Sequence, residues 1–327
     1  MSELAAAPGA GPLPGPAPAA SPPSVEPAAT PPPARGGAAA LVERVAPYLF
    51  LSPAMVLFLI FVLGPMIGTL VLSLFHWDLL GEPTFAGTDN YSKLLDDETL
   101  RKALGNTFEF TFWSIVLHVG LGLILALGVS RKTWRVTRYF LRTAYFFPFL
   151  VSWAATALIW KYAYDPAFGV FTYYGDKIGL PGGVLVDAHW AMPALILVDL
   201  WHTIGFSFVV ILAGLQAIPS HLYEAALIDG ANAWRRFWHV TLPMLSPTLF
   251  FVTVISFIGA FQIFEPMFLM TRGGPDGATI SVVQYLYETA FRDFQVGYAS
   301  AIALLVFVIV LLATLIQFRL RRRWVHE

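Results

Sequence analysis

The chain of 327 residues contains no cysteine, so disulfide bonds, thiol catalysis and cysteine-based metal sites are excluded. Charged residues are scarce: Asp, Glu, Lys and Arg make up 13% of the chain, about half the share typical of soluble proteins. The formal net charge of −1 gives no long-range field that would attract nucleic acid. The seven histidines show no metal-ligating spacing such as His-Glu-x-x-His. No Gly-x-x-x-x-Gly-Lys-Ser/Thr loop is present to cradle nucleotide phosphates, and we expect no cofactor.

Apolar side chains, in contrast, make up 57% of the chain. This composition predicts an all-α polytopic membrane protein, because lipid offers no hydrogen bonds and the backbone must satisfy its own in helices. Six segments each approach the ~20 apolar residues that a spanning helix needs. They cover about residues 48–75, 107–129, 140–160, 190–214, 246–270 and 296–318. Together they define a transmembrane domain at residues 45–323.

Residues 1–38 consist mostly of Ala, Pro, Gly and Ser. Such a segment cannot build a core, so we expect a disordered cytoplasmic tail that transport does not need. It does not resemble a cleaved signal, because the charged-then-apolar order begins only at Glu43 and Arg44.

The distribution of basic residues predicts the orientation. With the N-terminus inside, thirteen of the 20 Lys and Arg residues fall on inner segments, as the positive-inside rule requires. The basic cluster at residues 319–323 is then inside, and the acidic run at residues 96–98 is outside. Both termini and the loop between the fourth and fifth segments are therefore predicted to be cytoplasmic.

That loop is a polar stretch at residues 220–243. Good helix formers run from Tyr223 to Ile228, and Gly230 supplies the left-handed or otherwise unusual backbone common at a helix end. Apolar side chains then recur at helical spacing, at Trp234, Phe237, Trp238 and Leu242. The pattern predicts a hairpin of two short helices, and its shape alone also fits a plain linker between two spans.

The spacing within this stretch is more specific than its shape. Its fixed positions are Glu224, Ala225, Ala226, Gly230, Val240, Leu242 and Pro243. This pattern resembles the cytoplasmic coupling loop of ABC importer permeases, in which an isoleucine usually stands at the position of Val240. Further stretches resemble the carbohydrate-uptake branch of that family, with its maltose-type and glycerol-phosphate-type sugar permeases: residues 85–91, 142–148, 214–219, 271–275 and 297–301.

The resemblance implies a membrane-spanning permease subunit that translocates a sugar and is not itself an enzyme. It implies three kinds of partner: a second homologous permease subunit, an ABC ATPase dimer on the cytoplasmic side and an external sugar-binding protein. The ATPase-coupling residues would be Glu224, Ala225, Ala226, Asp229, Gly230, Leu242 and Pro243. The chain would lie in the cytoplasmic membrane of a bacterium or archaeon. The missing nucleotide cradle agrees with this, because such a subunit takes its energy from a partner.

Two acids, Asp199 and Glu265, stand inside apolar segments. Ionisable groups within a span are costly and usually face a cavity or a partner helix. Asp199-Leu200-Trp201 resembles an Asn-x-Trp of maltose-type permeases in which the Asn contacts sugar, and a carboxylate also accepts hydrogen bonds from sugar hydroxyls. A structural hydrogen bond between helices is the alternative for both acids.

The register set by the resemblance gives the candidate substrate-binding residues: Asp199, Thr203, Phe206, Ser256, Trp153, Phe149, Ala260 and Ile263, with His202 also on a pocket-facing position. The family's polar pocket residues are partly replaced here, at Trp153, Ala260 and Ile263. Trp153 and Trp201 offer flat faces that either stack on sugar rings or pack between helices. No Lys or Arg lies in the middle of a span, which favours a neutral sugar or polyol over a phosphorylated or carboxylated one.

Two other classes of function remain open from the residues alone. An ion-coupled secondary transporter or channel would use Asp199 and Glu265 as proton or cation sites, although the halves of the chain show no convincing inverted repeat. An intramembrane enzyme would need a nucleophile–base pair or a metal motif, and neither is apparent.

Overall fold

We describe a computed structural model of the chain over residues 37–130, 135–179 and 182–324. The tail predicted at residues 1–38 lies outside these ranges, except for its last two residues, which open the first helix. The chain divides into two compact units, one ending at Phe58 and one beginning at Leu59, and each is described by itself.

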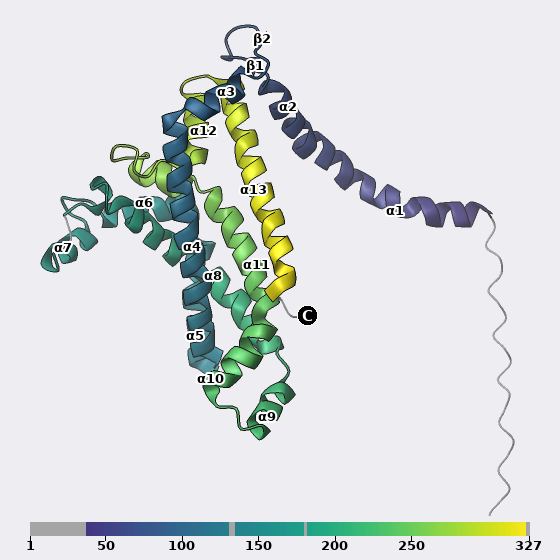
Figure 1. Cartoon of the computed structure of the whole chain (residues 1–327), viewed down its shortest axis with the longest axis vertical. Coiled ribbons are helices and arrows are strands. Elements are labelled where there is room, and N and C mark those ends of the chain that lie inside the picture. Colours follow the sequence, from purple (N-terminus) through teal and green to yellow (C-terminus); the bar gives the residue numbers. More distant parts are fainter. Residues whose placement is uncertain (1–36, 131–134, 180–181, 325–327) are drawn as a thin grey trace, which may run out of the picture. The chain divides into compact units, whose positions relative to one another are not determined.

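The described elements are mostly helices (Figure 1). The α-helices are α1 (Gly37–Phe58), α2 (Gly64–Leu72), α3 (Asp89–Asp96), α4 (Glu98–Ser130), α5 (Arg135–Phe146), α6 (Trp153–Ala163), α7 (Val170–Lys177), α8 (Ala191–Ala217), α9 (Ser220–Ile228), α10 (Ala233–Arg236), α11 (Leu242–Phe261), α12 (Val282–Phe291) and α13 (Val296–Trp324). Short 3-10 or π segments are η1 (Leu59–Leu63), η2 (Phe147–Leu150), η3 (Val184–Val186), η4 (Phe237–Thr241) and η5 (Met267–Thr271). Strands β1 (Phe75–His76) and β2 (Thr84–Phe85) pair antiparallel.

Five helical runs within the described ranges are long and apolar enough to cross a membrane: Val45–Leu72, Glu98–Ser130, Ala191–Ala217, Ala233–Phe261 and Val296–Arg322. A bent pair of helices, Phe140–Leu150 and Trp153–Ala163, is a sixth candidate. The prediction of a helical, multi-pass chain is thus confirmed at the level of five or six candidate spans.

In the first unit, α1 is the described element. Its side chains from Tyr48 to Phe58 are exposed, although nearly all of them are apolar. Pro47 and Pro53 lie inside the helix and leave two carbonyls without an intrahelical donor. An exposed, uncharged face of this kind suits lipid or another subunit.

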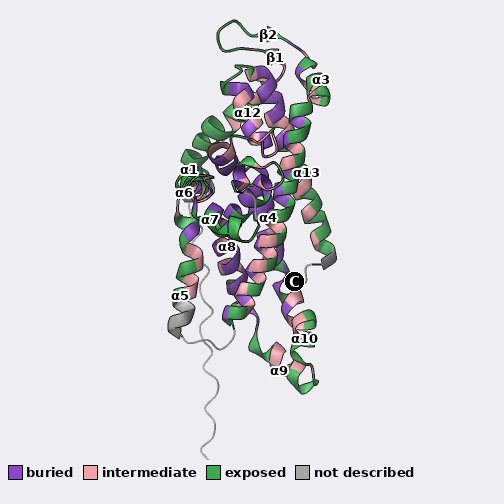
Figure 2. Cartoon of the chain, turned by 90° about the vertical axis from the view of Figure 1, so that its left-hand side faces the viewer, coloured by how far each residue is buried: buried purple, intermediate pink, exposed green. Residues whose placement is uncertain are grey.

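The core of the second unit lies where α4, α8 and α11 pack together, with α13 against α11 and α12. Small residues let the helices approach: a Cβ on Gly122 of α4 would lie 3.2 Å from the Cβ of Ser207 on α8. A Cβ on Gly205 would lie 2.1 Å from the carbonyl oxygen of Tyr145, so the α5 backbone rests directly on α8. Close approach over small residues is how spanning helices pack without a hydrophobic driving force. Figure 2 shows the buried residues concentrated along these helices.

The third predicted span, residues 140–160, is not one straight helix. After η2, Val151 and Ser152 adopt extended backbone, and the chain then turns by 98° into α6. Pro148 has no backbone N–H to continue the helix. The carbonyl of Val151 instead accepts a hydrogen bond from Nε2 of His202 on α8, at 2.9 Å. The break is therefore held by side chains that the apolar pattern does not reveal.

The fifth predicted segment, residues 246–270, is also displaced. α11 ends at Phe261, and Glu265 is an exposed residue beyond that end. At the other end, α10, η4 and α11 form one helical run from Ala233, so the second helix of the predicted hairpin continues into this span. Pro243 therefore lies inside this run, at the start of α11 and close behind the π segment η4, where the regular α-helical hydrogen-bond pattern is already interrupted. The remaining spans differ mainly in length, with α4 beginning at Glu98 rather than near residue 107.

Candidate functional site

The eight predicted substrate-binding residues line one cavity of about 280 Å³ in the second unit. Asp199, Thr203 and Phe206 come from α8, Ser256 and Ala260 from α11, Ile263 from just beyond it, Phe149 from η2 and Trp153 from α6. Its lining also includes His118 of α4, together with Ser207, Ile255 and Gly259. The structure thus brings the predicted residues together, while their role in binding stays a prediction.

A polar cluster occupies the α4 side of this cavity. Asp199 and His118 are only 3% and 4% exposed. The Oδ2 atom of Asp199 accepts a hydrogen bond from the Oγ of Ser114 at 2.7 Å and lies 3.1 Å from Nε2 of His118. Thr203 Oγ1 donates to the backbone carbonyl of Asp199 at 2.6 Å and lies 2.5 Å from the same Nε2. Asp199 therefore joins α4 to α8 while it lines the cavity.

Aromatic rings cover the opposite part of the cavity. Phe149 and Phe206 stack with ring centroids 5.4 Å apart. Trp153 stacks on the imidazole of His202 at 3.9 Å, and His202 itself is buried behind the lining. Trp201, the other tryptophan proposed to stack on sugar, is 42% exposed and meets Trp160 edge-on, away from this cavity. Only Trp153 of the two tryptophans is positioned to contact a ligand here.

Reasoning from the sequence missed His118 and Ser114. Both lie on α4, which the apolar pattern predicted as a span without any reading of its polar residues. Their separation of four residues places them on one helix face, and both are buried. A pair of polar residues at helical spacing inside an apolar segment was the signal that could have found them.

The helical hairpin predicted at residues 220–243 is α9 followed by α10 and η4. Gly230 has φ +73°, which confirms the left-handed backbone predicted there. The N–H groups of Gly230 and Ala231 donate to the carbonyls of Leu227 and Ala226, the pattern of a Schellman helix end. Asn232 caps the next helix by accepting from the backbone N–H of Arg235 at 2.9 Å. Hydrogen bonds between residues that are close in the sequence therefore form this turn.

The hairpin leaves large apolar side chains uncovered. Ile228 is 88% exposed and Trp234 is 68% exposed, while Glu224 and Asp229 are exposed beside them. A cavity of about 1120 Å³ lies between the hairpin and the ends of α4 and α8. Leu242 and Pro243 do not share this exposure, since both are half-buried and Leu242 packs against the core. The predicted coupling residues thus divide into an exposed group in α9 and its turn, and a group that anchors the hairpin.

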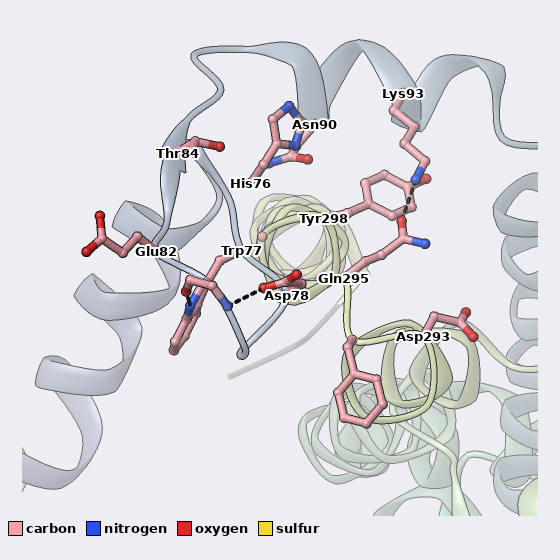
Figure 3. Close-up of a pocket in the computed structure, with 13 residues that line it drawn as sticks. His76, Trp77, Asp78, Glu82, Thr84, Asn90, Lys93, Asp293, Gln295 and Tyr298 are labelled. Atoms are coloured by element: carbon pink, nitrogen blue, oxygen red, sulfur yellow. Dashed lines mark hydrogen bonds between the residues drawn. The ribbon is translucent and has the colours of Figure 1, made fainter.

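The opposite end of this unit carries β1, β2 and a cavity of about 400 Å³ (Figure 3). Lys93 joins its edges, donating to Gln295 at 2.6 Å and lying over the ring of Tyr298. Beside it, Asp97 accepts hydrogen bonds from the hydroxyls of Tyr285 and Tyr298, both at 2.6 Å. Burial opposes ionisation of Asp97, but these two phenols and the backbone N–H of Leu100 outweigh it and lower the pKa of the carboxyl.

Residues 118–326 match the family described as "Binding-protein-dependent transport system inner membrane component". The chain is 37% identical over 281 residues to the probable ABC transporter permease protein YurN of Bacillus subtilis, covering 85% of this chain and 96% of that protein. It is 34% identical over 281 residues to the arabinooligosaccharides transport system permease protein AraP of the same organism, covering 85% and 89%. A solved bacterial ABC transporter involved in the import of the acidic polysaccharide alginate has a chain that superposes with a TM-score of 0.76 at 25% identity, covering 88% of this chain and 98% of that one.

Proposed function

The chain belongs to the family of binding-protein-dependent transport system inner membrane components, and we propose from this premise how it moves a sugar. It is a multi-pass membrane protein and the permease subunit of a sugar ABC importer, not an enzyme. Its partners are a second permease subunit, ATPase subunits and an extracytoplasmic sugar-binding protein. The alternative of an ion-coupled transporter finds no support in these relatives, and Glu265 is exposed beyond the end of α11.

We propose that the chain has six spans, with the bent pair around Pro148 as the third, in a bacterial or archaeal cytoplasmic membrane. The α9 end is then cytoplasmic and the β1–β2 end is outside. Basic residues support this orientation, since Arg235 and Arg236 lie in the hairpin and four arginines lie at residues 319–323, at the end of α13. Both termini are cytoplasmic in this arrangement.

We propose that the α9–α10 hairpin docks in a cleft of one ATPase subunit. The exposed apolar side chains of Ile228 and Trp234 supply buried area on docking, and Glu224 and Asp229 supply polar contacts at the edge. The small side chains of Ala225 and Ala226 allow α9 to approach the cleft closely. Because α10 continues into α11, movement of the ATPase is transmitted to a helix that lines the substrate cavity.

We propose that the cavity between α4, α8 and α11 is this chain's share of the substrate path. Its aromatic residues, Phe149, Trp153 and Phe206, suit the flat apolar faces of sugar rings. Asp199 supplies an acceptor for sugar hydroxyls, and Ser256 supplies both a donor and an acceptor. The relatives carry arabinooligosaccharides in one case and the acidic polysaccharide alginate in another, so family membership alone does not choose between neutral and acidic sugars.

The observation that carries the proposed function is the family match over residues 118–326, which includes both the hairpin and the residues that line the cavity. The test is purification of the tagged chain in mild detergent with Gly230→Pro or Glu224→Lys. We expect both variants to insert normally, to lose the co-purifying ATPase and to abolish sugar uptake, because proline cannot adopt φ +73°.

Gly179→Pro is the matched control, because Gly179 also has a positive φ of +79° and an open surrounding but lies next to α7. It should retain the ATPase. Wild-type uptake by both hairpin variants would reduce the hairpin to a linker.

A further inference from the structure

His118 was not anticipated from the sequence, and its surroundings determine its chemistry. Thr203 donates its hydroxyl proton to the carbonyl of Asp199, so its oxygen can meet Nε2 of His118 only as an acceptor. The carboxylate oxygen of Asp199 lies 3.1 Å from the same Nε2. Both neighbours require a proton on Nε2, which assigns the Nε2–H tautomer to a neutral imidazole. The lone pair of such a ring is then on Nδ1.

Within this polar cluster, two acceptor atoms have no hydrogen bond to the described part of the chain: Nδ1 of His118 and Oδ1 of Asp199. Neither atom is among the fully buried side-chain polar atoms that have no hydrogen-bond partner within the described residues. Both residues line the cavity beside Thr203 and Ser256, and no Lys or Arg is among its lining residues. The polar side of the cavity therefore presents two acceptor atoms side by side, and one of them belongs to the carboxylate of Asp199.

We propose that His118 is a specificity-determining residue that positions Asp199 and itself accepts a hydrogen bond from a sugar hydroxyl. Two acceptors side by side match the O–H groups of a neutral, hydroxyl-rich sugar, whereas a carboxylated or phosphorylated sugar meets a like charge and no basic partner. This inference rests on the proposed function, because it names the substrate class of the same cavity.

The first test is ATP-driven uptake by the complete importer in proteoliposomes with its binding protein. The probes are labelled neutral oligosaccharides (arabinotriose, maltotriose) and an alginate-derived trisaccharide. Uptake of a neutral sugar in preference to the acidic one is the expected result. Preferential uptake of the acidic probe overturns the proposal but leaves the importer function standing. Absence of uptake for every probe overturns both.

The second test measures equilibrium binding of the transported neutral probe to the purified importer without binding protein. His118→Ala should weaken binding about tenfold or more, because it removes one acceptor and one partner of Asp199. His118→Gln, which keeps an acceptor and a donor, should recover most of that loss. His189→Gln, at an exposed histidine before α8, is the matched control and should bind as the wild type does. Unchanged affinity in a folded His118→Ala complex overturns the proposal.

If the alanine variant does not assemble, the wild-type importer with ¹⁵N-labelled histidine gives the answer. Addition of the neutral probe should shift the Nδ1 resonance of His118 and leave Nε2–H protonated. A purely structural histidine predicts no shift at Nδ1, and that result contradicts the proposal.

Discussion

Replacement of Asp199 separates a role in substrate binding from a role in holding helices together. Its carboxylate accepts from Ser114 at 2.7 Å and lies 3.1 Å from His118, with almost no exposure. Removing the carboxylate leaves the hydroxyl of Ser114 and the Nε2–H of His118 buried without this acceptor, at a cost of about 1–3 kcal/mol for each unsatisfied group. Asp199→Ala is therefore expected to destabilise the α4–α8 contact by about that amount.

Asp199→Asn keeps the shape and one carbonyl acceptor but removes the charge. It should cost only about 1–2 kcal/mol of stability, because neutral hydrogen bonds replace charge-assisted ones. The affinity for sugar should fall by more than the stability does. Losing a charge-assisted hydrogen bond to a sugar hydroxyl costs about 1.5–3 kcal/mol, which is about tenfold to a hundredfold in affinity. The asparagine variant should thus assemble well and bind sugar poorly.

The assays are thermal unfolding of the purified importer and equilibrium binding of the transported sugar. Asp176→Asn, at an exposed position on α7, is the control and should change neither. If Asp199→Asn assembles and binds sugar as tightly as the wild type, the carboxylate serves only to join α4 and α8 and does not bind sugar.

Two further predictions concern packing and pH. Gly205→Ala should lower the unfolding temperature and disturb the cavity, because its Cβ would lie 2.1 Å from the carbonyl oxygen of Tyr145 and overpacking costs about 1–3 kcal/mol or more; a normal melting curve would contradict this. The lowered pKa of Asp97 means that its bonds to Tyr285 and Tyr298 contribute fully above the unfolded pKa of about 3.9 and are lost as pH falls below it. The protection factors of the α12 amides, which are corrected for the pH dependence of intrinsic exchange, should therefore be unchanged between about pH 7 and 5 and fall below about pH 4, and Asp97→Asn should show the lower protection already at neutral pH.

Much of this fold could be predicted because lipid limits the backbone conformations that a spanning segment can adopt. A backbone without water must form helices, so the length and the apolar composition of the segments located α8 and α13 closely. The turn at Gly230 was predictable as well, because glycine adopts the left-handed backbone of a helix end without the steric penalty of a Cβ atom.

The breaks in the third and fifth segments could not be located in this way. Hydropathy is the same on both sides of Val151, whose carbonyl is bonded by a histidine 51 residues later in the chain. Similarly, α11 ends at Phe261 within an apolar run. Such positions are set by tertiary contacts, which a count of apolar residues does not contain.

The candidate cavity shows the same division. The resemblance placed Asp199, Phe206 and Ser256 on pocket-facing positions of two different segments, and the structure brings them to one cavity. His118 lies in the second span, 81 residues before Asp199, and only helix packing brings the two together. A sequence motif therefore could not predict the half of the polar cluster that lies on α4.

Import of a sugar by this chain, with energy taken from a partner ATPase, can be followed in proteoliposomes that contain the permease pair and the ATPases. ATP is trapped inside, the sugar-loaded binding protein is added outside, and the accumulation of labelled sugar is measured. We expect accumulation that requires both ATP and the binding protein and is lost with Gly230→Pro. Accumulation that proceeds without ATP and follows an imposed ion gradient would contradict this expectation.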